Sequence, residues 1–408
     1  MSVPISPRRP RSPYEAELLA TARRLLPSGV RNASLAAEYA MVVQAAHGAR
    51  ITDVSGNEYV DYLLGSGPLL LGHAHPAVTA AVREQLERGS SYLLVNEPAI
   101  RLAEAIVELV PCAEAVSFHS TGSEATFFAL RLARAFRRRD TILKFEGAYH
   151  GMGDHALMST QWTYEPAPFP AAVPSSSGIP ASARAEVLVA PFNDLATTTA
   201  IIEQHHDALA AVIVEPLQRT IPPAPGFLTE LRRITAHYGI VLVFDEVVTG
   251  FRLALGGAQE RYGVTPDLCV LGKSISAGHP LGVVCGRRDI LALADPERRQ
   301  HGDSVLLTGT YSGNPISAAA ALACIAELRR PGVYAALAAT GSYLMTTLQR
   351  LCDEARVPVH VLGEPAVFQP WFTSGEIVDH RSTLSADRGR AAAFTDRLLD
   401  AGVVKAHE

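Results

Sequence analysis

The chain has 408 residues, with 36 basic and 41 acidic side chains and a formal net charge of −5. A protein that holds nucleic acid by phosphate contacts needs a basic surplus, so this balance argues against that class of function. With 48% hydrophobic residues the chain can bury a large core, and its length predicts two domains or a large domain with a smaller one attached.

The ends of the chain and its cysteines predict a cytoplasmic protein. The N-terminal segment is rich in Pro, Ser and Arg and lacks the apolar core of a secretory signal. No apolar run reaches the roughly 18 residues that span a bilayer. The five cysteines include no CxxC pair, which favours buried free thiols in a reducing compartment. We therefore expect no membrane contact and no bound metal.

The first hundred residues predict three helices and a hairpin. Residues 13–28 have a helical pattern, and Ser55-Gly56-Asn57 forms the turn between strands at 49–54 and 58–62. Amphipathic helices are expected at 76–86 and 99–109.

Seven short apolar strands follow, each with a turn and a helical stretch behind it. This alternation predicts an α/β fold with a mostly parallel, seven-stranded sheet that carries helices on both faces. Ligands of such sheets bind beyond the carboxyl ends of the strands. The expected strands are Ala115–Phe118, Thr141–Phe145, Glu186–Ala190, Ala211–Val214, Ile240–Phe244, Leu268–Leu271 and Leu281–Cys285.

The rest of the chain suggests a loop and a second, smaller domain. Residues 162–185 have no periodicity and predict a long surface loop, whereas 316–330 predict a helix rich in small residues. The tail from about residue 331 alternates helix and strand. We expect an N-terminal segment at 1–60 that packs with the small domain, a large domain at 61–310, and a small α+β C-terminal domain at 311–408.

Two candidate ligand sites follow the first two strands. Thr121 and Glu124 fit a capping box around Gly122 and Ser123, and the start of a helix attracts a phosphate. After the next strand, glycines surround Tyr149, which leaves room for a flat ring to stack on it. Taken alone, each of these features is better explained by an ordinary capped helix or an ordinary glycine-rich turn.

Two further strands end in charged residues. Asp245 ends one of them, and a buried carboxylate there needs a cation, either a protein side chain or the protonated ring nitrogen of a cofactor. Lys273 follows another of the predicted strands, where burial favours the neutral, nucleophilic amine. A lysine that pairs with a nearby carboxylate is the simpler explanation. Only two other lysines exist, Lys144 inside a strand and Lys405 near the C-terminus. Together the four features fit pyridoxal 5'-phosphate, which has a phosphate, a ring, a pyridinium nitrogen and an aldehyde.

With these motifs the sequence resembles the class III pyridoxal-phosphate aminotransferases, most closely the glutamate-1-semialdehyde 2,1-aminomutase branch. The resemblance covers the chain from about residue 13 onward. Val248 stands where diamine and ω-amino-acid aminotransferases carry Gln, which favours the aminomutase-like branch. The family resemblance rests on residues 48–62, 72–76, 120–125, 144–151, 214–216, 244–252, 271–273 and 309–315.

The resemblance implies fold type I and a role for each site residue. Lys273 would form the Schiff base and move protons at the substrate carbon, and Asp245 would pair with the ring nitrogen. Tyr149 and Val247 would cover the two faces of the ring, with His150 in support. Gly122 and Ser123 would bind the phosphate. Thr310 would reach the phosphate of the neighbouring subunit's cofactor, which implies a homodimer with shared active sites. His73 and His75 resemble a metal pair, but the family places them in a structural loop.

Three departures from the branch concern the substrate pocket and the chain end. Leu35 stands where the aminomutases carry an Arg that grips the substrate carboxylate, with Arg31 close but offset. Ser66 replaces a Trp. Relatives continue for some tens of residues beyond Glu408, so we expect a truncated chain or an incomplete small domain.

We expect an aminotransferase that moves an amino group between a small amine or amino acid and a carbonyl acceptor through Lys273. Two alternatives remain. One is intramolecular amino transfer by an aminomutase, an isomerase that uses the same residues. The other is a non-catalytic homologue that binds the cofactor, although the Lys273–Asp245 pair argues against it. A nucleotide-binding protein is disfavoured because the Gly122 turn is neither GxGxxG nor a Walker loop.

Overall fold

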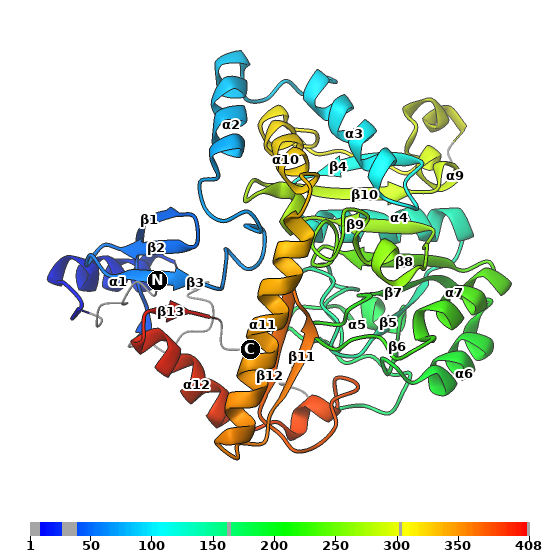
Figure 1. The fold of residues 1–408 in the computed structure, drawn as a ribbon. Coiled ribbons are helices and arrows are strands. Elements are labelled where there is room, and N and C mark those ends of the chain that lie inside the picture. Colours follow the sequence, from blue (N-terminus) through cyan, green and yellow to red (C-terminus); the bar gives the residue numbers. More distant parts are fainter. Residues whose placement is uncertain (1–8, 27–38, 161–164, 302–303, 406–408) are drawn as a thin grey trace.

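A seven-stranded sheet with the order β4-β10-β9-β8-β7-β5-β6 forms the centre of the large unit (Figure 1). The computed structural model describes residues 9–26, 39–160, 165–301 and 304–405. All neighbouring strands are parallel except β10, which runs antiparallel to β4 and β9. The predicted bounds differ from the observed ones by at most two residues at either end: β4 (Ala115–His119), β5 (Thr141–Phe145), β6 (Val187–Ala190), β7 (Leu209–Val214), β8 (Val241–Glu246), β9 (Leu268–Leu271) and β10 (Gly282–Gly286).

Helices cover both faces of this sheet because its strands are apolar on both sides. One face packs against α4, α5 and α9, whereas the other packs against α6 and α7 at one end and α2, α3 and α10 at the other. The fold is therefore α/β fold type I with a mostly parallel sheet, as predicted. The bounds are α2 (Pro76–Arg88), α3 (Glu97–Leu109), α4 (Gly122–Arg137), α5 (Ala181–Ala185), α6 (Leu195–His205), α7 (Phe227–His237), α9 (Arg288–Leu291) and α10 (Pro315–Leu328).

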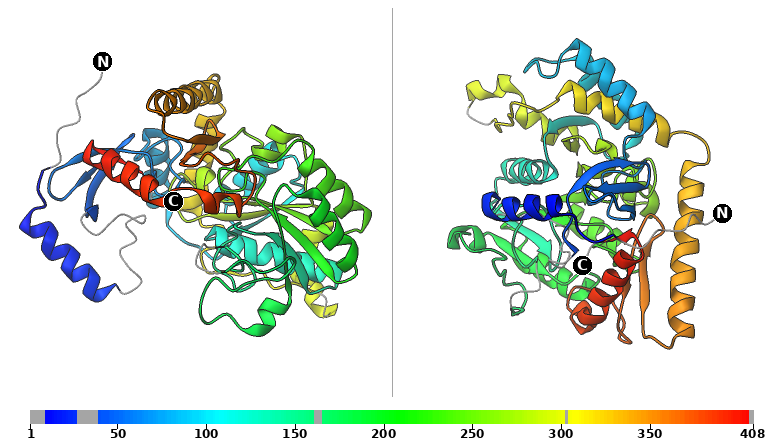
Figure 2. Two further views of the ribbon diagram at one scale, coloured as in Figure 1. Left: turned by 90° about the horizontal axis from the view of Figure 1, so that it is seen from below. Right: turned by 90° about the vertical axis from the view of Figure 1, so that its left-hand side faces the viewer.

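The two ends of the described chain meet in a second sheet. The hairpin at residues 49–62 has the expected antiparallel pairing, and the C-terminal strand β13 runs parallel to β3. Figure 2 shows α12 and β13 beside the N-terminal strands. The elements of this region are α1 (Pro13–Leu25), β1 (Val43–His47), β2 (Arg50–Asp53), β3 (Glu58–Asp61), α12 (Arg388–Asp400) and β13 (Val403–Val404).

A long helix and a hairpin complete the C-terminal part. They are α11 (Val333–Glu354) and the antiparallel pair β11 (His360–Glu364) and β12 (Val367–Trp371), followed by the short helix η5 (Ser382–Ser385). The preceding helix α10 packs against α2 and α3 of the large unit, and the first residues of α11, Val333 and Tyr334, pack against the same core. The division of the chain at residues 60 and 310 remains a proposal.

The prediction of a long surface loop at residues 162–185 agrees with the described residues 165–180, which form no helix or strand, but it is wrong at the end of the segment. Residues 181–185 form α5, and Ala171 makes an isolated bridge to Leu188 of the edge strand β6. Ala172 and Ala183 are buried in the core. The small side chains that hid any periodicity are the ones that let this segment pack closely against the sheet edge.

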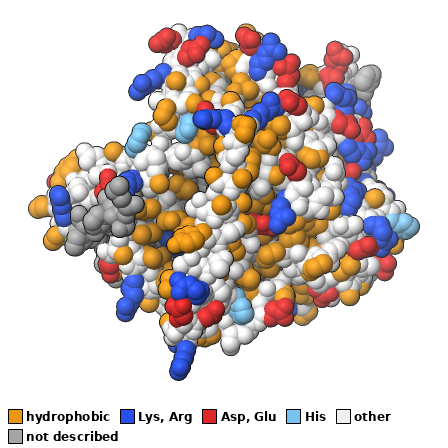
Figure 3. Space-filling model, viewed as in Figure 1, with side chains coloured by type: hydrophobic (Ala, Val, Ile, Leu, Met, Phe, Trp, Pro, Cys, Tyr) orange, Lys and Arg blue, Asp and Glu red, His pale blue; other side chains and the backbone are white. Residues whose placement is uncertain are grey.

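No described helix is both long enough and apolar enough to cross a membrane. On the face shown in Figure 3, acidic and basic side chains are interspersed. This distribution agrees with the small net charge of the chain.

Candidate active site

The carboxylate of Asp245 lies at the carboxyl end of β8, in a buried position with two fixed partners. Its Oδ2 is 2.7 Å from Nδ1 of His150, and its Oδ1 accepts a hydrogen bond of 3.1 Å from the backbone N–H of Val247. Asp245 is 5% exposed and His150 is 1% exposed. The pair holds one carboxylate in a fixed orientation at the edge of the sheet. Sequence reasoning predicted His150 as a supporting residue without identifying this partner.

Lys273 begins the turn of 3₁₀ helix η2 (Lys273–Ser276), directly after β9. In the sheet register Asp245 lies opposite Val270, three residues before the lysine. Burial lowers the pKa of Lys273, while the carboxylates of Asp245 and Glu215 raise it and do not cancel the effect. A lysine with a lowered pKa has more of its neutral, nucleophilic form.

Lys273 also has a left-handed backbone, with φ of +32°. This region is uncommon for residues other than glycine, and such strain persists where the surrounding structure imposes it. Its next residues are buried, and Cys324 Sγ contacts the carbonyl of Ser274 at 3.3 Å. The turn that carries the lysine is therefore held in place by its contact with α10.

The loop that forms the wall above Lys273 is also strained. Leu64, Gly65, Ser66 and Gly67 have consecutive positive φ angles of 50°, 66°, 67° and 104°. A Cβ atom on Gly67 would lie 3.3 Å from Cδ of Lys273, so this loop contacts the lysine stem. Ser66, where the aminomutases carry Trp, thus stands beside a residue that touches Lys273.

Arg252 fastens this loop to the turn after β8. Its guanidinium donates to the carbonyl of Val248 at 2.8 Å and to the carbonyl of Gly67. The side chain is buried, and burial lowers its pKa to about 10. The arginine of the Phe244–Arg252 stretch is therefore a structural link between two loops of the site.

The start of α4 provides the predicted anion site. Thr121 and Glu124 form both halves of the capping box, which leaves the first-turn N–H groups of Gly122 and Ser123 without acceptors in the helix. A Cβ atom on Gly151 would lie 2.6 Å from Oγ of Ser123, so the loop after β5 lies against this helix start. Only glycine permits that approach.

Val247 lies between the helix start and the lysine turn. A Cβ atom on Gly122 would be 3.1 Å from Cγ2 of Val247, and one on Gly272 would be 3.4 Å from its Cγ1. The start of α4, Val247 and the turn that carries Lys273 therefore lie next to one another at the edge of the sheet. An apolar side chain at this place can cover one face of a planar ligand.

Tyr149 lies between the Gly147 turn and His150, with its ring partly buried. The guanidinium carbon of Arg219, in the turn after β7, stands 5.5 Å from the centre of that ring. Sequence reasoning predicted Tyr149 but missed Arg219, because nothing in the local sequence shows that the two turns meet.

Several residues of these turns have buried polar atoms without partners. Among the described residues, buried atoms with no hydrogen-bond partner include Nε2 of His150, Oε2 of Glu215, Oε1 of Gln218 and Oγ of Ser274. Such atoms are uncommon in native structures, and a polar ligand explains their presence. A carboxylate, a helix N-terminus, an aromatic side chain and a nucleophilic lysine are the groups that pyridoxal phosphate needs, so the residues fit it.

Glu215 directly follows β7, at the Val214-Glu215-Pro216 motif, and its side chain is buried. Burial raises the pKa of Glu215, and the charges of Arg219, His150 and Lys273 only partly offset this effect. The protonated form of Glu215 is therefore favoured by its burial.

Lys144 is buried in a site of a different kind. Its Nζ donates to the carbonyls of Ala148, Ala156 and Met158 and lies 3.0 Å from Oγ1 of Thr160. These acceptors saturate the amine, and burial lowers its pKa to about 7. Lys144 thus ties the loop after β5 to its own strand.

The C-terminal segment closes one side of the site. Arg381 makes two hydrogen bonds to the carboxylate of Glu146, at 2.7 and 3.1 Å. A Cβ atom on Gly147 would lie within 3 Å of the His380 ring. The turn that carries Tyr149 is therefore held by residues more than 200 positions away in the sequence.

Three of the cysteines that are scattered in the sequence come together. The sulfur atoms of Cys112, Cys269 and Cys285 all lie within 4.8 Å of one another in the core. The nearby Glu246 already accepts hydrogen bonds from Ala258, Gln259 and Thr249. Its oxygens are therefore not free to complete a metal site, and the thiols pack as small apolar groups.

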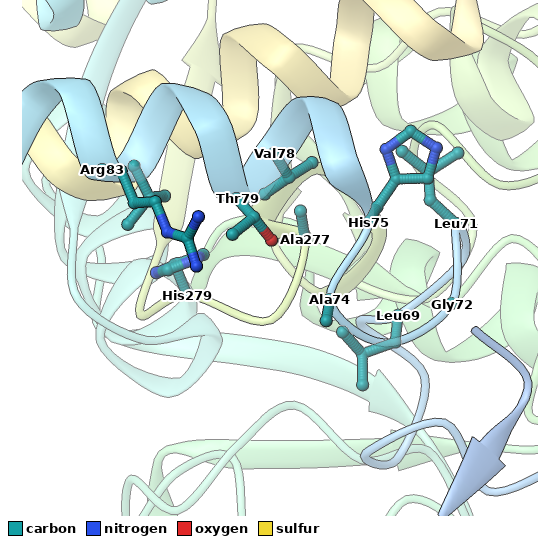
Figure 4. A pocket seen from close by; sticks show the side chains of 11 residues that line it. Leu69, Leu71, Gly72, Ala74, His75, Val78, Thr79, Arg83, Ala277 and His279 are labelled. Carbon is teal, nitrogen blue, oxygen red and sulfur yellow. The ribbon is translucent and has the colours of Figure 1, made fainter. Parts of the chain in front are cut away.

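A separate cavity of about 320 Å³ lies on the other side of the lysine turn (Figure 4). It is lined by the loop at residues 69–75, the first turns of α2, and Ala277 and His279. His75 faces this cavity, whereas His73 pairs with Asp61 at 2.7 Å. The two histidines therefore have different surroundings.

Three predicted positions remain, namely Thr310 for the cofactor phosphate and Leu35 and Arg31 for the substrate carboxylate. Thr310 is exposed in the loop before α10. Leu35 and Arg31 lie outside the described residues, as does the chain end at 406–408.

Comparison with known proteins finds the same family throughout. The family description "Aminotransferase class-III" matches residues 33–407. A glutamate-1-semialdehyde 2,1-aminomutase of Methanosarcina acetivorans is 39% identical over 94% of this chain and 89% of its own length. An ω-transaminase from Sphaerobacter thermophilus superimposes with a TM-score of 0.91 and 36% identity, covering 98% of this chain and 92% of its own.

An aminomutase structure from Pseudomonas aeruginosa gives a TM-score of 0.85 and 26% identity, covering 97% of this chain and 88% of its own. A related structure of that aminomutase is in complex with PMP. Both activities thus occur among proteins of this architecture.

Proposed function

Because the chain belongs to the class III aminotransferases and its cofactor is pyridoxal 5'-phosphate, we propose that it transfers an amino group between a small amine or amino acid and a carbonyl acceptor. The observation that carries the proposal is the position of Lys273, whose amine has a lowered pKa at the strand end beside the fixed carboxylate of Asp245.

Each site residue has a role that follows from its surroundings. When bound, the cofactor supplies an electron sink that makes a proton on the amine-bearing carbon acidic. The neutral amine of Lys273 accepts that proton and returns it at the carbon that becomes the new amine centre. Asp245 offers its charge to the ring nitrogen, and His150 keeps the carboxylate in place.

The remaining residues bind and orient. The N–H groups of Gly122 and Ser123 at the start of α4 favour the phosphate, helped by the helix dipole. Tyr149 and Val247 confine the ring from its two faces. The wall formed by residues 64–67 and fixed by Arg252 restricts water around Lys273.

A homodimer is part of the proposal, and the exposed residues beside Thr310 support it. Leu93, Leu94 and Val95 are 78%, 78% and 85% exposed in the segment between α2 and α3. Asn96 and Asn314 hydrogen-bond this segment to the loop that follows Thr310. A contiguous apolar run next to Thr310 fits a subunit interface. Sedimentation at micromolar concentration checks it; a monomer with full activity would contradict it.

Aminomutase activity is the second candidate, because curated relatives with about the same length carry that name. The two reactions differ in one observable. With an amino donor alone, a transaminase releases one carbonyl product per site, whereas an aminomutase converts glutamate 1-semialdehyde to an isomer of equal mass with no second substrate. Mass spectrometry of a single turnover decides between them.

The test of the function itself uses the visible absorbance of the purified protein. We expect a yellow protein whose colour is lost in Lys273→Ala while its far-UV circular dichroism is unchanged. A wild-type protein that takes up no added pyridoxal phosphate would overturn the proposal.

A further inference from the structure

Arg219 lies at the tip of the turn that follows β7, and hydrogen bonds fix the residues on both sides of it. Gln218 and Ile221 exchange two backbone hydrogen bonds, of 3.1 and 2.8 Å, across the pair Arg219-Thr220. Gln218 also donates to the carbonyl of Glu146 at 2.8 Å, and Thr220 accepts from the Trp371 indole at 3.3 Å. Arg219 is therefore the exposed tip of a tight turn that is anchored on both sides.

The backbone of Arg219 has a positive φ of 59°, which is uncommon for a residue other than glycine. The turn would form more easily with glycine, so an arginine here is not explained by the local fold. Such strain at an anchored position is often associated with function.

The guanidinium of Arg219 points at the site. It stands 5.5 Å from the centre of the Tyr149 ring, and its Nε is 3.5 Å from the carbonyl of Gly147. Its two terminal nitrogens make no hydrogen bond or ion pair with any described residue. A pair of parallel donors is thus presented beside the residue that confines the cofactor ring.

The other cationic side chains near the candidate site already have carbonyl or carboxylate partners. Arg252 donates to two carbonyls, Arg381 is paired with Glu146, and the amine of Lys144 is saturated. The charge of Arg219 acts within the site, since it lowers the pKa of Lys273 and opposes the rise in that of Glu215. Within the described part of the chain, Arg219 is the cation near Tyr149 left to bind an anion.

We propose that Arg219 binds the carboxylate of the substrate, so that the enzyme acts on amino acids and oxo acids in preference to simple amines. This inference rests on the proposed aminotransferase function. A guanidinium binds a carboxylate through two parallel charge-assisted hydrogen bonds, which gives orientation as well as affinity. It also accounts for how the chain can do without an arginine at position 35, where the sequence has Leu.

The test compares a pair of amino donors that differ in the carboxylate, 3-aminobutanoate and 2-aminobutane, with the holoenzyme. Arg219→Gln should lower kcat/KM for 3-aminobutanoate by about 100-fold and change that for 2-aminobutane by less than about threefold. Arg219→Lys keeps the charge without the fork and should lose about tenfold. Arg350→Gln is the matched control, because Arg350 is exposed on α11 and pairs with Glu354.

A second readout does not depend on turnover. Isothermal titration of each holoenzyme with butanoate, with butan-1-ol as the uncharged control, measures carboxylate binding directly. Wild type and Arg350→Gln should bind butanoate, and Arg219→Gln should not.

The outcomes separate the two proposals. Coloured variants that bind butanoate equally well, or an Arg219→Gln variant that loses both donors to the same extent, would overturn the role of Arg219. A wild-type enzyme that prefers 2-aminobutane would overturn it too. A wild-type protein that stays colourless with pyridoxal phosphate would overturn the aminotransferase function, and the carboxylate proposal with it.

Discussion

Replacing Lys144 by methionine should change the stability of the protein in a way that depends strongly on pH. The structure gives Lys144 a pKa of about 7, against an ordinary value of 10.5. Between these values the unfolded chain holds the extra proton, so unfolding becomes harder as pH rises. The gain in the free energy of unfolding is complete above pH 10.5, where the lysine is neutral in both states, and it is lost as pH falls toward 7. A methionine side chain has no proton to bind, so the Lys144→Met variant lacks this slope.

The magnitude follows from two opposing effects. The substitution removes about three buried hydrogen bonds of the amine, worth roughly 3–4 kcal/mol. It also removes the cost of deprotonating the lysine on folding, at about 1.36 kcal/mol per pH unit, or about 4 kcal/mol near pH 7.5. The variant should therefore be about as stable as wild type near pH 7.5. Near pH 9.5 the wild type should gain about 3 kcal/mol over the variant, because the same slope acts over two pH units.

Urea unfolding of the apo-proteins at the two pH values measures this difference without interference from the cofactor. Lys405→Met, at a partly exposed position near the C-terminus, controls for the loss of a lysine. A stability difference between Lys144→Met and wild type that does not vary with pH would refute the reasoning, because it would mean that Lys144 keeps its proton on folding. Lys144→Met should still turn yellow with pyridoxal phosphate.

Three further substitutions or measurements test other parts of the site and the core. Asp245→Asn keeps a partner for His150 but removes the charge, so kcat/KM should fall about 10²–10³-fold. The thermal melt of the apo-protein should stay close to that of wild type. A fully active variant would argue against the pairing of Asp245 with the ring nitrogen. Thr121→Ala removes the N-cap of α4 and should cost about 1 kcal/mol in urea unfolding and weaken cofactor binding, whereas unchanged cofactor affinity would separate the capping box from the phosphate site. Titration with a thiol reagent should modify only Cys352 in the native protein and all five cysteines after denaturation, because the other four are buried; rapid reaction of a second thiol would show that the core opens.

The central sheet could be predicted closely because its strands are short apolar runs with turns at both ends. What the sequence did not reveal is strand direction and distant pairing. The antiparallel course of β10 depends on the length of the connection through η2, and the pairing of Val403 with Val60 joins residues over 300 positions apart. Local periodicity contains no information on either.

A site residue could be predicted where its own neighbours in the sequence make it unusual. Lys273 and Asp245 stand out as charged residues at the ends of apolar strands. Arg219 does not, since its importance comes from the meeting of two turns that lie 70 positions apart. The cluster of Cys112, Cys269 and Cys285 was missed for the same reason, because the register of β9 and β10 pairs Cys269 with Cys285, and Cys112 reaches them from the turn after α3.

The central claim is that Lys273, alone among three lysines, holds the cofactor covalently. Borohydride reduction of the yellow holoenzyme fixes the cofactor on the amine that carries it, and peptide mass mapping then identifies that amine. We predict one phosphopyridoxyl group per chain, on the peptide that contains Lys273. A label on Lys144 or Lys405, or no label on a protein that has taken up the cofactor, would contradict it.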